Sequence, residues 1–139
     1  MKLKALLLTS SLVLASTAFA TTTSSLHHPL VKSIHFTINN ETGAPIQGLE
    51  EMPGVTNMSP TQLSYSTLPA GKTDLVFDVV NVGQIGGVAL VAQGADLQLS
   101  ATDDGKTYAC QGAGTLGVSC YATMGAHGVY NVIATVIKN

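Results

Sequence analysis

The chain contains no arginine and no tryptophan, and only 10% of its residues carry a charge. Proteins that bind nucleic acids neutralise phosphates with lysine and arginine, so six cations against eight carboxylates argue against that class. The same deficit argues against electrostatic attraction to an anionic membrane surface. After residue 20 no stretch approaches the ~20 apolar residues that a membrane-spanning helix needs, so no transmembrane segment is predicted.

Recognisable catalytic arrangements are also missing. No serine lies in a Gly-x-Ser-x-Gly elbow, and the aspartates do not have the spacing of a calcium-binding EF-hand loop. Glu50 and Glu51 lie in a predicted loop, and Asp103 and Asp104 precede a glycine turn, where solvent-exposed carboxylates are the ordinary outcome. A non-enzymatic protein is therefore predicted, although an active site built from dispersed residues stays open.

The first twenty residues have the three parts of a secretory signal peptide. Lys2 and Lys4 give a positive start, residues 5–15 are apolar, and Ala18-Phe19-Ala20 matches a cleavage site. We expect a bacterial Sec-type signal cleaved after Ala20, with the product in the periplasm or outside the cell. Cleavage would leave 119 residues with four lysines and eight carboxylates, a net charge of −4.

The two cysteines, Cys110 and Cys120, both follow the predicted cleavage site. In an oxidising compartment such a pair indicates a disulfide, which would stabilise the fold by about 2–3 kcal/mol on the chain-entropy account. The alternative is a thiolate that binds a metal or acts as a nucleophile. The export signal favours the disulfide.

The remainder has the alternation of β-strands. Residues 21–30 are predicted to be a flexible lead, and residues 31–139 one domain. Apolar residues alternate with polar ones over 33–38 and 129–137, and Asp103-Asp104-Gly105 predicts a hairpin turn. Residues 72–82 are apolar at most positions of both faces, which predicts a central, well-covered strand. Residues 48–60 are predicted to be a loop and 62–67 a strand. Together these features predict an all-β fold, a single antiparallel β-sandwich of about seven or eight strands.

Histidine and methionine side chains offer one candidate metal site. His35, Met124 and His127 are ligand types that suit copper, and Met124 and His127 lie three residues apart. The competing interpretation is structural or solvated side chains, since a tight site needs convergent ligands with supporting contacts. No other cofactor is predicted.

Residues 68–83, LPAGKTDLVFDVVNVG, resemble the segment of cupredoxin-like domains in which a Pro-Ala-Gly turn leads a strand into Asn-x-Gly. The stretch 120–136 is similar to their ligand loop. This resemblance implies a sandwich fold. It does not imply a blue-copper site, because Gln84-Ile85-Gly86-Gly87 stands where a ligand histidine would follow and the later order is Cys120, Met124, His127. Residues 128–132, GVYNV, are equally similar to the closing strand of bacterial immunoglobulin-like modules.

Two segments could form a surface for a partner. Residues 82–95 are uncharged and apolar, which indicates either a buried strand pair or an exposed docking loop. The loop 111–117, closed by the cysteines, is the second. The sequence thus predicts an exported, non-enzymatic module that binds a protein or carbohydrate through its loops. A periplasmic copper-binding protein that uses His35, Met124 and His127 is the alternative.

Overall fold

The computed structural model describes residues 30–52, 57–60 and 66–139, and the chain is all-β within them. The predicted signal peptide and residues 21–29 of the predicted lead lie outside the described residues. No helix in the described part is long and apolar enough to cross a membrane. The strands, with two 3-10 turns (η1 and η2), are β1 (Ser33–Asn40), β2 (Ile46–Gln47), β3 (Glu50–Glu51), β4 (Met58–Pro60), β5 (Thr67–Leu68), β6 (Gly71–Val79), β7 (Gly87–Ala92), η1 (Gln93–Ala95), β8 (Leu97–Thr102), β9 (Tyr108–Gly112), β10 (Leu116–Met124), η2 (Ala126–Gly128) and β11 (Val129–Lys138).

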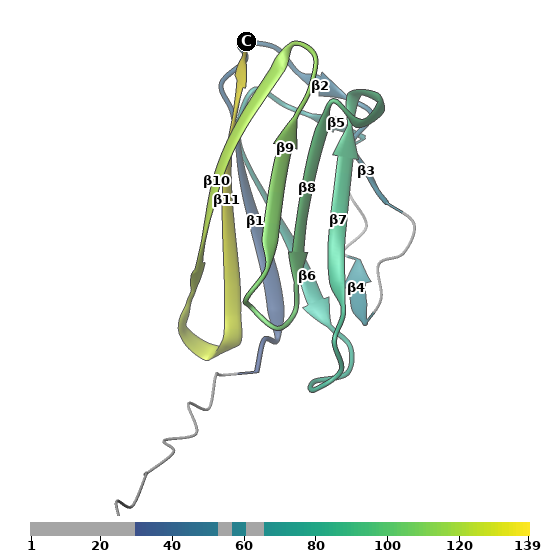
Figure 1. The fold of residues 1–139 in the computed structure, drawn as a ribbon, viewed down its shortest axis with the longest axis vertical. Helices are drawn as coiled ribbons and strands as arrows, with labels where there is room; N and C mark the ends of the chain where they lie inside the picture. Colours follow the sequence, from purple (N-terminus) through teal and green to yellow (C-terminus); the bar gives the residue numbers. More distant parts are fainter. Residues whose placement is uncertain (1–29, 53–56, 61–65) are drawn as a thin grey trace, which may run out of the picture.

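Most of these strands form two sheets (Figure 1). The larger sheet has the order β10-β11-β1-β6-β4, and the smaller has the order β3-β7-β8-β9. β2 and β5 make a separate short ladder. In the described part of the chain neither sheet closes into a barrel. Seven of the strands have five residues or more, and the remaining four have two or three.

The pairing of β1 with β11 corrects the prediction of a purely antiparallel arrangement. These two strands run parallel, with Ser33 opposite Val129 and Asn40 opposite Val136. The other described ladders are antiparallel. The alternation of apolar residues fixes which face of a strand is buried but carries no information on strand direction, so the sequence could not reveal the parallel pair.

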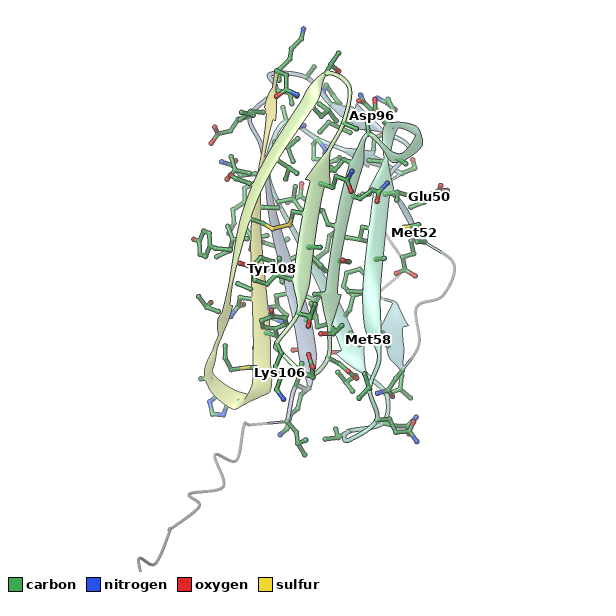
Figure 2. The ribbon with its side chains drawn as sticks, in the orientation of Figure 1. Glu50, Met52, Met58, Asp96, Lys106 and Tyr108 are labelled. Atoms are coloured by element: carbon green, nitrogen blue, oxygen red, sulfur yellow. A yellow bond between two sulfur atoms is a disulfide. The ribbon has the colours of Figure 1, made fainter. Side chains whose placement is uncertain are left out.

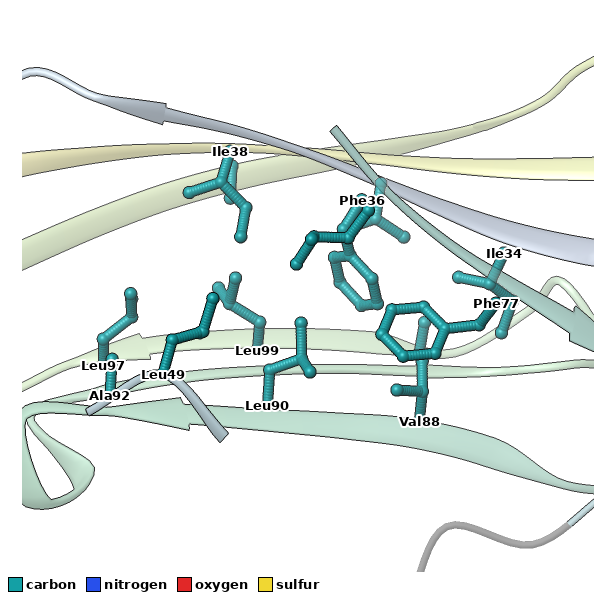
Figure 3. Close-up of a cluster of buried hydrophobic side chains, with 14 of the residues drawn as sticks. Ile34, Phe36, Ile38, Leu49, Phe77, Val88, Leu90, Ala92, Leu97 and Leu99 are labelled. Carbon is teal, nitrogen blue, oxygen red and sulfur yellow. The ribbon is translucent and has the colours of Figure 1, made fainter. Parts of the chain in front are cut away.

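The core lies between the two sheets and is built from the alternating residues (Figure 3). Ile34, Phe36 and Ile38 of β1 are fully buried, and Leu97 and Leu99 of β8 are buried opposite them. The ring of Phe36 meets that of Phe77, a diagonal neighbour on β6, edge to face at a centroid distance of 6.2 Å. The predicted inward faces of β1 and β11 are confirmed, since Tyr130, Val132, Ala134 and Val136 are also buried.

Two predictions in the middle of the chain were wrong. The strand predicted over 72–82 ends at Val79, and only one of its faces is covered, because Asp74 and Asp78 are exposed on the other. The loop predicted over 48–60 contains β3, which pairs with β7, and β4, which pairs with β6. Both strands are too short to show an alternating pattern. The strand predicted over 62–67 lies largely outside the described residues.

The disulfide joins the two sheets at one edge, where Figure 2 shows the sulfur–sulfur bond between β9 and β10. Cys110 belongs to the smaller sheet and Cys120 to the larger, and their Cα atoms are 6.2 Å apart. This pairing confirms the predicted bond. The chain therefore passes from one sheet to the other through a short turn at 113–115, and the disulfide holds the two strands together beyond that turn.

Candidate functional site

The connection from β6 to β7, residues 80–86, presents apolar side chains to solvent; we call it the β6–β7 loop. Val80, Val82 and Ile85 are 59%, 50% and 81% exposed. The loop lies at the end of the molecule where the chain enters β1 (Figure 1), and it contains no charged residue. Apolar residues gathered on one loop are unusual on a monomer's surface, where single scattered ones are normal.

The segment that suggested a partner surface is thus divided by the structure. Its second half forms β7, in which Val88, Leu90 and Ala92 belong to the core. Its first half is the exposed β6–β7 loop. The structure therefore shows burial for one part of the uncharged segment and solvent exposure for the other, and docking by the exposed part stays a prediction.

The side chain of Asn57 holds this loop in place. Its amide nitrogen lies 3.0 Å from the carbonyl oxygen of Asn81 and 2.8 Å from that of Gln84, and donates to both. In return, the Asn81 amide donates to the Asn57 side-chain oxygen at 2.7 Å. The backbone of Asn57 also accepts a hydrogen bond from Val80. Four contacts from one residue thus fix both ends of the turn between Val80 and Gln84.

Asn57 has a left-handed backbone, with φ of 60°. Asparagine adopts this conformation more readily than most residues because its short polar side chain can bond locally. The conformation and the side-chain contacts therefore both favour asparagine at this position.

Asp103 is the second anchor and lies beneath the loop. Its side chain is 6% exposed; one carboxylate oxygen accepts from the Gly86 amide at 2.6 Å and the other from the Asn57 amide at 2.9 Å. The Asp103 amide donates back to the Gly86 carbonyl. Hydrogen bonds to a carboxylate are stronger than neutral ones, and here both oxygens are satisfied.

The expectation of two solvated carboxylates at 103–104 was consequently wrong for Asp103, although the hairpin turn itself is confirmed. Asp104 is only half-buried and stabilises the turn. The Thr102 hydroxyl and the Lys106 amide donate to it and hold the pKa of its carboxyl below the ordinary value. The two neighbouring aspartates therefore have different tasks, one under the β6–β7 loop and one within the hairpin.

A shallow cavity of about 110 Å³ adjoins the loop. Leu30, Ile85 and Asp103 are among its lining residues. Leu30 is itself 59% exposed, so a fourth aliphatic side chain lies at this end of the molecule. The site offers a partner an aliphatic contact area beside a small recess that Asp103 lines in part.

The second predicted surface, residues 111–117, is mostly strand. β9 extends to Gly112 and β10 begins at Leu116, which leaves a three-residue turn. The Ala113 amide donates to the Asp96 carbonyl at 2.7 Å, and the Asn139 amide donates to the Thr115 carbonyl at 2.9 Å. This turn has small residues and lies at the opposite end from the β6–β7 loop (Figure 1).

The predicted metal ligands are not directed toward one point. His35 lies on β1 opposite Asn131, on the face of the larger sheet that is turned away from the core. Met124 lies opposite the buried Tyr130 and packs against the core, so its side chain is on the other face. His127 is exposed in η2, with φ of 58°. Among the described residues no group of three or more histidine, cysteine, aspartate or glutamate side chains could hold a metal ion.

Sequence reasoning missed Asn57 and the burial of Asp103. The two residues are 46 positions apart, and neither belongs to a motif. No local sequence signal identifies either anchor, because their contacts form only in the folded chain. No family model matches the chain, and no curated protein matches it.

Proposed function

We propose that this chain is an exported, non-enzymatic binding module that docks onto another protein through the β6–β7 loop. The observation that carries the proposal is the exposure of Val82 and Ile85 on a loop fixed by two polar anchors. A loop held in one conformation loses little conformational freedom on binding, which favours affinity. The scaffold we propose is a β-sandwich of the immunoglobulin-like or cupredoxin-like kind.

The chemistry of the loop favours a protein partner over a carbohydrate. Its exposed large side chains are aliphatic, and they can bury apolar area in a groove of another protein. Sugar rings are commonly bound by flat aromatic rings, and the β6–β7 loop has none. Its lack of charge also means that docking would depend little on salt.

Export is supported by the disulfide between Cys110 and Cys120, because such bonds persist in oxidising compartments. The signal-peptide pattern of residues 1–20 points the same way. The final location, periplasm or exterior, would decide which partners the loop meets.

A saturation-binding experiment tests the proposal. Fluorescently labelled protein is titrated onto the cell-envelope fraction and onto the secreted proteins of the organism that makes it. We expect saturable binding that unlabelled protein displaces and that Val82→Ser with Ile85→Ser weakens at least about tenfold. The matched control is Ile137→Ser, an exposed apolar residue at the end of β11, which should leave binding unchanged.

Two results would refute the proposal. One is the absence of saturable binding in every fraction. The other is an equal loss of binding in the Ile137→Ser control, which would show a general response to surface hydrophobicity rather than docking by the β6–β7 loop.

A further inference from the structure

The strand β10 forms one edge of the larger sheet and lacks the usual protection of an edge. Its nine residues, LGVSCYATM, include no charged residue and no proline. Edge strands in natural proteins are ordinarily shielded by charges, prolines, bulges or very short length, because their free amides and carbonyls can pair with another strand. The opposite edges are short by comparison, with three residues in β4 and two in β3.

One part of the β10 edge is covered and another is open. At its start, the backbone of Leu116 to Val118 lies against Gly112 of β9. A Cβ atom added to Gly112 would lie 2.5 Å from the carbonyl oxygen of Leu116. Beyond this, β10 is paired only with β11 among the described strands. In Figure 1 no further strand lies outside β10 at this margin of the molecule. The open part therefore begins near Ser119 and continues toward Met124.

We propose that this edge pairs with the same edge of a second copy of the chain. Two identical edge strands can join antiparallel about a two-fold axis perpendicular to the sheet, which is the commonest symmetry of homo-oligomers. Directly opposed residues of an antiparallel pair have their side chains on the same face of the sheet. The two-fold axis must therefore lie midway between the two copies of one residue, which then face each other. Placed at Tyr121, it opposes Ser119 to Thr123 and Cys120 to Ala122, and it uses the open part of the edge.

Charge and side-chain type favour a second copy as the occupant. A charged residue at the two-fold axis would face the same charge of its copy, and this strand has no charged residue to be repelled. The outward side chains would form a Tyr121 pair flanked by two Ser–Thr pairs, and both are favourable cross-strand combinations. Tyr121 is 57% exposed, so the contact would also remove apolar area from water.

The inward side chains fit as well. Cys120 and Ala122 already pack against the core of their own copy, and the association leaves that packing unchanged. The β6–β7 loop lies outside the contact. The two sheets would join into one continuous sheet with two β10 strands at its centre.

Such an interface is small, because only five residues of each copy pair. Contacts of this size are weak and reversible. We expect a dissociation constant in the micromolar range or above, of the order of 10⁻⁵ to 10⁻³ M. The association would matter where the protein is concentrated, for example where several copies dock side by side.

The test is sedimentation of the purified chain from about 1 µM to about 1 mM. We expect a concentration-dependent monomer–dimer equilibrium. Tyr121→Lys, which places two ammonium groups face to face on the axis, should weaken it at least about tenfold. Ser59→Lys adds the same charge to β4 at the opposite edge and should leave it unchanged.

Amide hydrogen exchange identifies the edge directly. Alternate backbone amides of Ser119 to Thr123 face away from β11 and should exchange fast at low concentration and slowly at high concentration. A monomer at every concentration would overturn the proposal. A dimer that Tyr121→Lys does not weaken, or one that leaves these amides in fast exchange, would overturn it equally.

Discussion

The carboxylate of Asp103 accepts a hydrogen bond of 2.9 Å from the side-chain amide of Asn57, a residue 46 positions earlier in the chain. The contact connects the segment before β4 with the hairpin between β8 and β9. The β6–β7 loop lies between them and bonds to both residues. An exposed apolar loop is thus fixed to the rest of the fold by polar contacts, not by burial of its own side chains.

Replacement of Asn57 tests this anchoring. Asn57→Ala removes the amide that serves three oxygens and leaves a non-glycine residue in a left-handed conformation, so we expect a loss of about 2–4 kcal/mol in the free energy of unfolding. Asn57→Gly relieves the backbone cost alone and should recover about 1 kcal/mol. Urea unfolding measures both variants. If Asn57→Ala unfolds like the native chain, the anchor has no role in stability.

The exposed side chains of the same loop should behave differently. Val82→Ser with Ile85→Ser removes apolar atoms that are already in water, so the free energy of unfolding should change by less than about 0.5 kcal/mol. Thermal unfolding followed by circular dichroism checks this expectation. A large destabilisation would mean that these residues support the fold, and a loss of binding in the same variant could then not be assigned to docking.

The disulfide between β9 and β10 should contribute measurably to stability. Its two cysteines are separated by ten positions, and closing a loop of that size stabilises a fold by about 2–3 kcal/mol on the chain-entropy account. We expect Cys110→Ser with Cys120→Ser to lower the free energy of unfolding by that amount. Addition of a reductant to the native chain should give the same loss and should not affect the double variant. An equal free energy of unfolding for the oxidised and the reduced native chain would show that the disulfide does not stabilise the fold.

The pair of Phe36 and Phe77 marks the centre of the core. Both rings are fully buried, so Phe36→Ala should cost about 3–5 kcal/mol through lost burial and the cavity left behind. Ile137→Ala, at a side chain that is 47% exposed, should cost less than about 1 kcal/mol. Chemical denaturation of the two variants compares them. Similar losses in both would show that Phe36 does not lie in the core.

Glu51 gives a prediction about pH. Burial raises the pKa of its carboxyl, and one of its oxygens is buried without a hydrogen-bond partner. The folded chain therefore holds more protons than the unfolded chain in the window just above the ordinary carboxyl pKa, and the free energy of unfolding falls as pH rises through that window. Glu51→Gln cannot titrate, so its stability relative to the native chain should improve from about pH 4 to pH 7.

The neighbouring Glu50 provides the control, because its side chain is exposed on the same strand. Glu50→Gln removes the same charge from an exposed side chain, so it separates the effect of burial at Glu51 from that of the change in net charge. The explanation fails if Glu51→Gln keeps the pH dependence of the native chain, or if both variants change alike. The expected difference for Glu51→Gln is small, below about 1 kcal/mol at neutral pH.

The regular strands were predictable because their alternation is a local property. Ile34, Phe36 and Ile38 are spaced for one face of a strand, and the glycine after Asp103 and Asp104 specifies a turn, so both features could be located within a few residues. The pairing of Cys110 with Cys120 followed from there being two cysteines and from the predicted export signal. The very short strands β3 and β4 could not be predicted, since they form only because longer strands offer them an edge.

The candidate site was harder to predict, because its anchors act across the fold. The sequence indicated an uncharged apolar segment but could not decide which half is buried. That division depends on where β6 ends and on the bonds from Asn57 and Asp103, which are close only in the folded chain. The same limitation affected His35 and Met124. Their ligand chemistry is visible in the sequence, while their placement on opposite faces of one sheet depends on the register of β1 and β10 with β11.

The most direct test of the docking loop is photo-crosslinking from position 84. The side chain of Gln84 is exposed within the loop, and only its backbone contacts Asn57, so a benzophenone side chain can replace it. In the cells that make the protein, we predict one dominant protein adduct whose yield falls at least about tenfold when Val82→Ser and Ile85→Ser are added. A benzophenone at Thr115, in the turn at the opposite end, should not give that adduct. No discrete adduct from position 84, or an undiminished yield in the serine variant, would contradict the account.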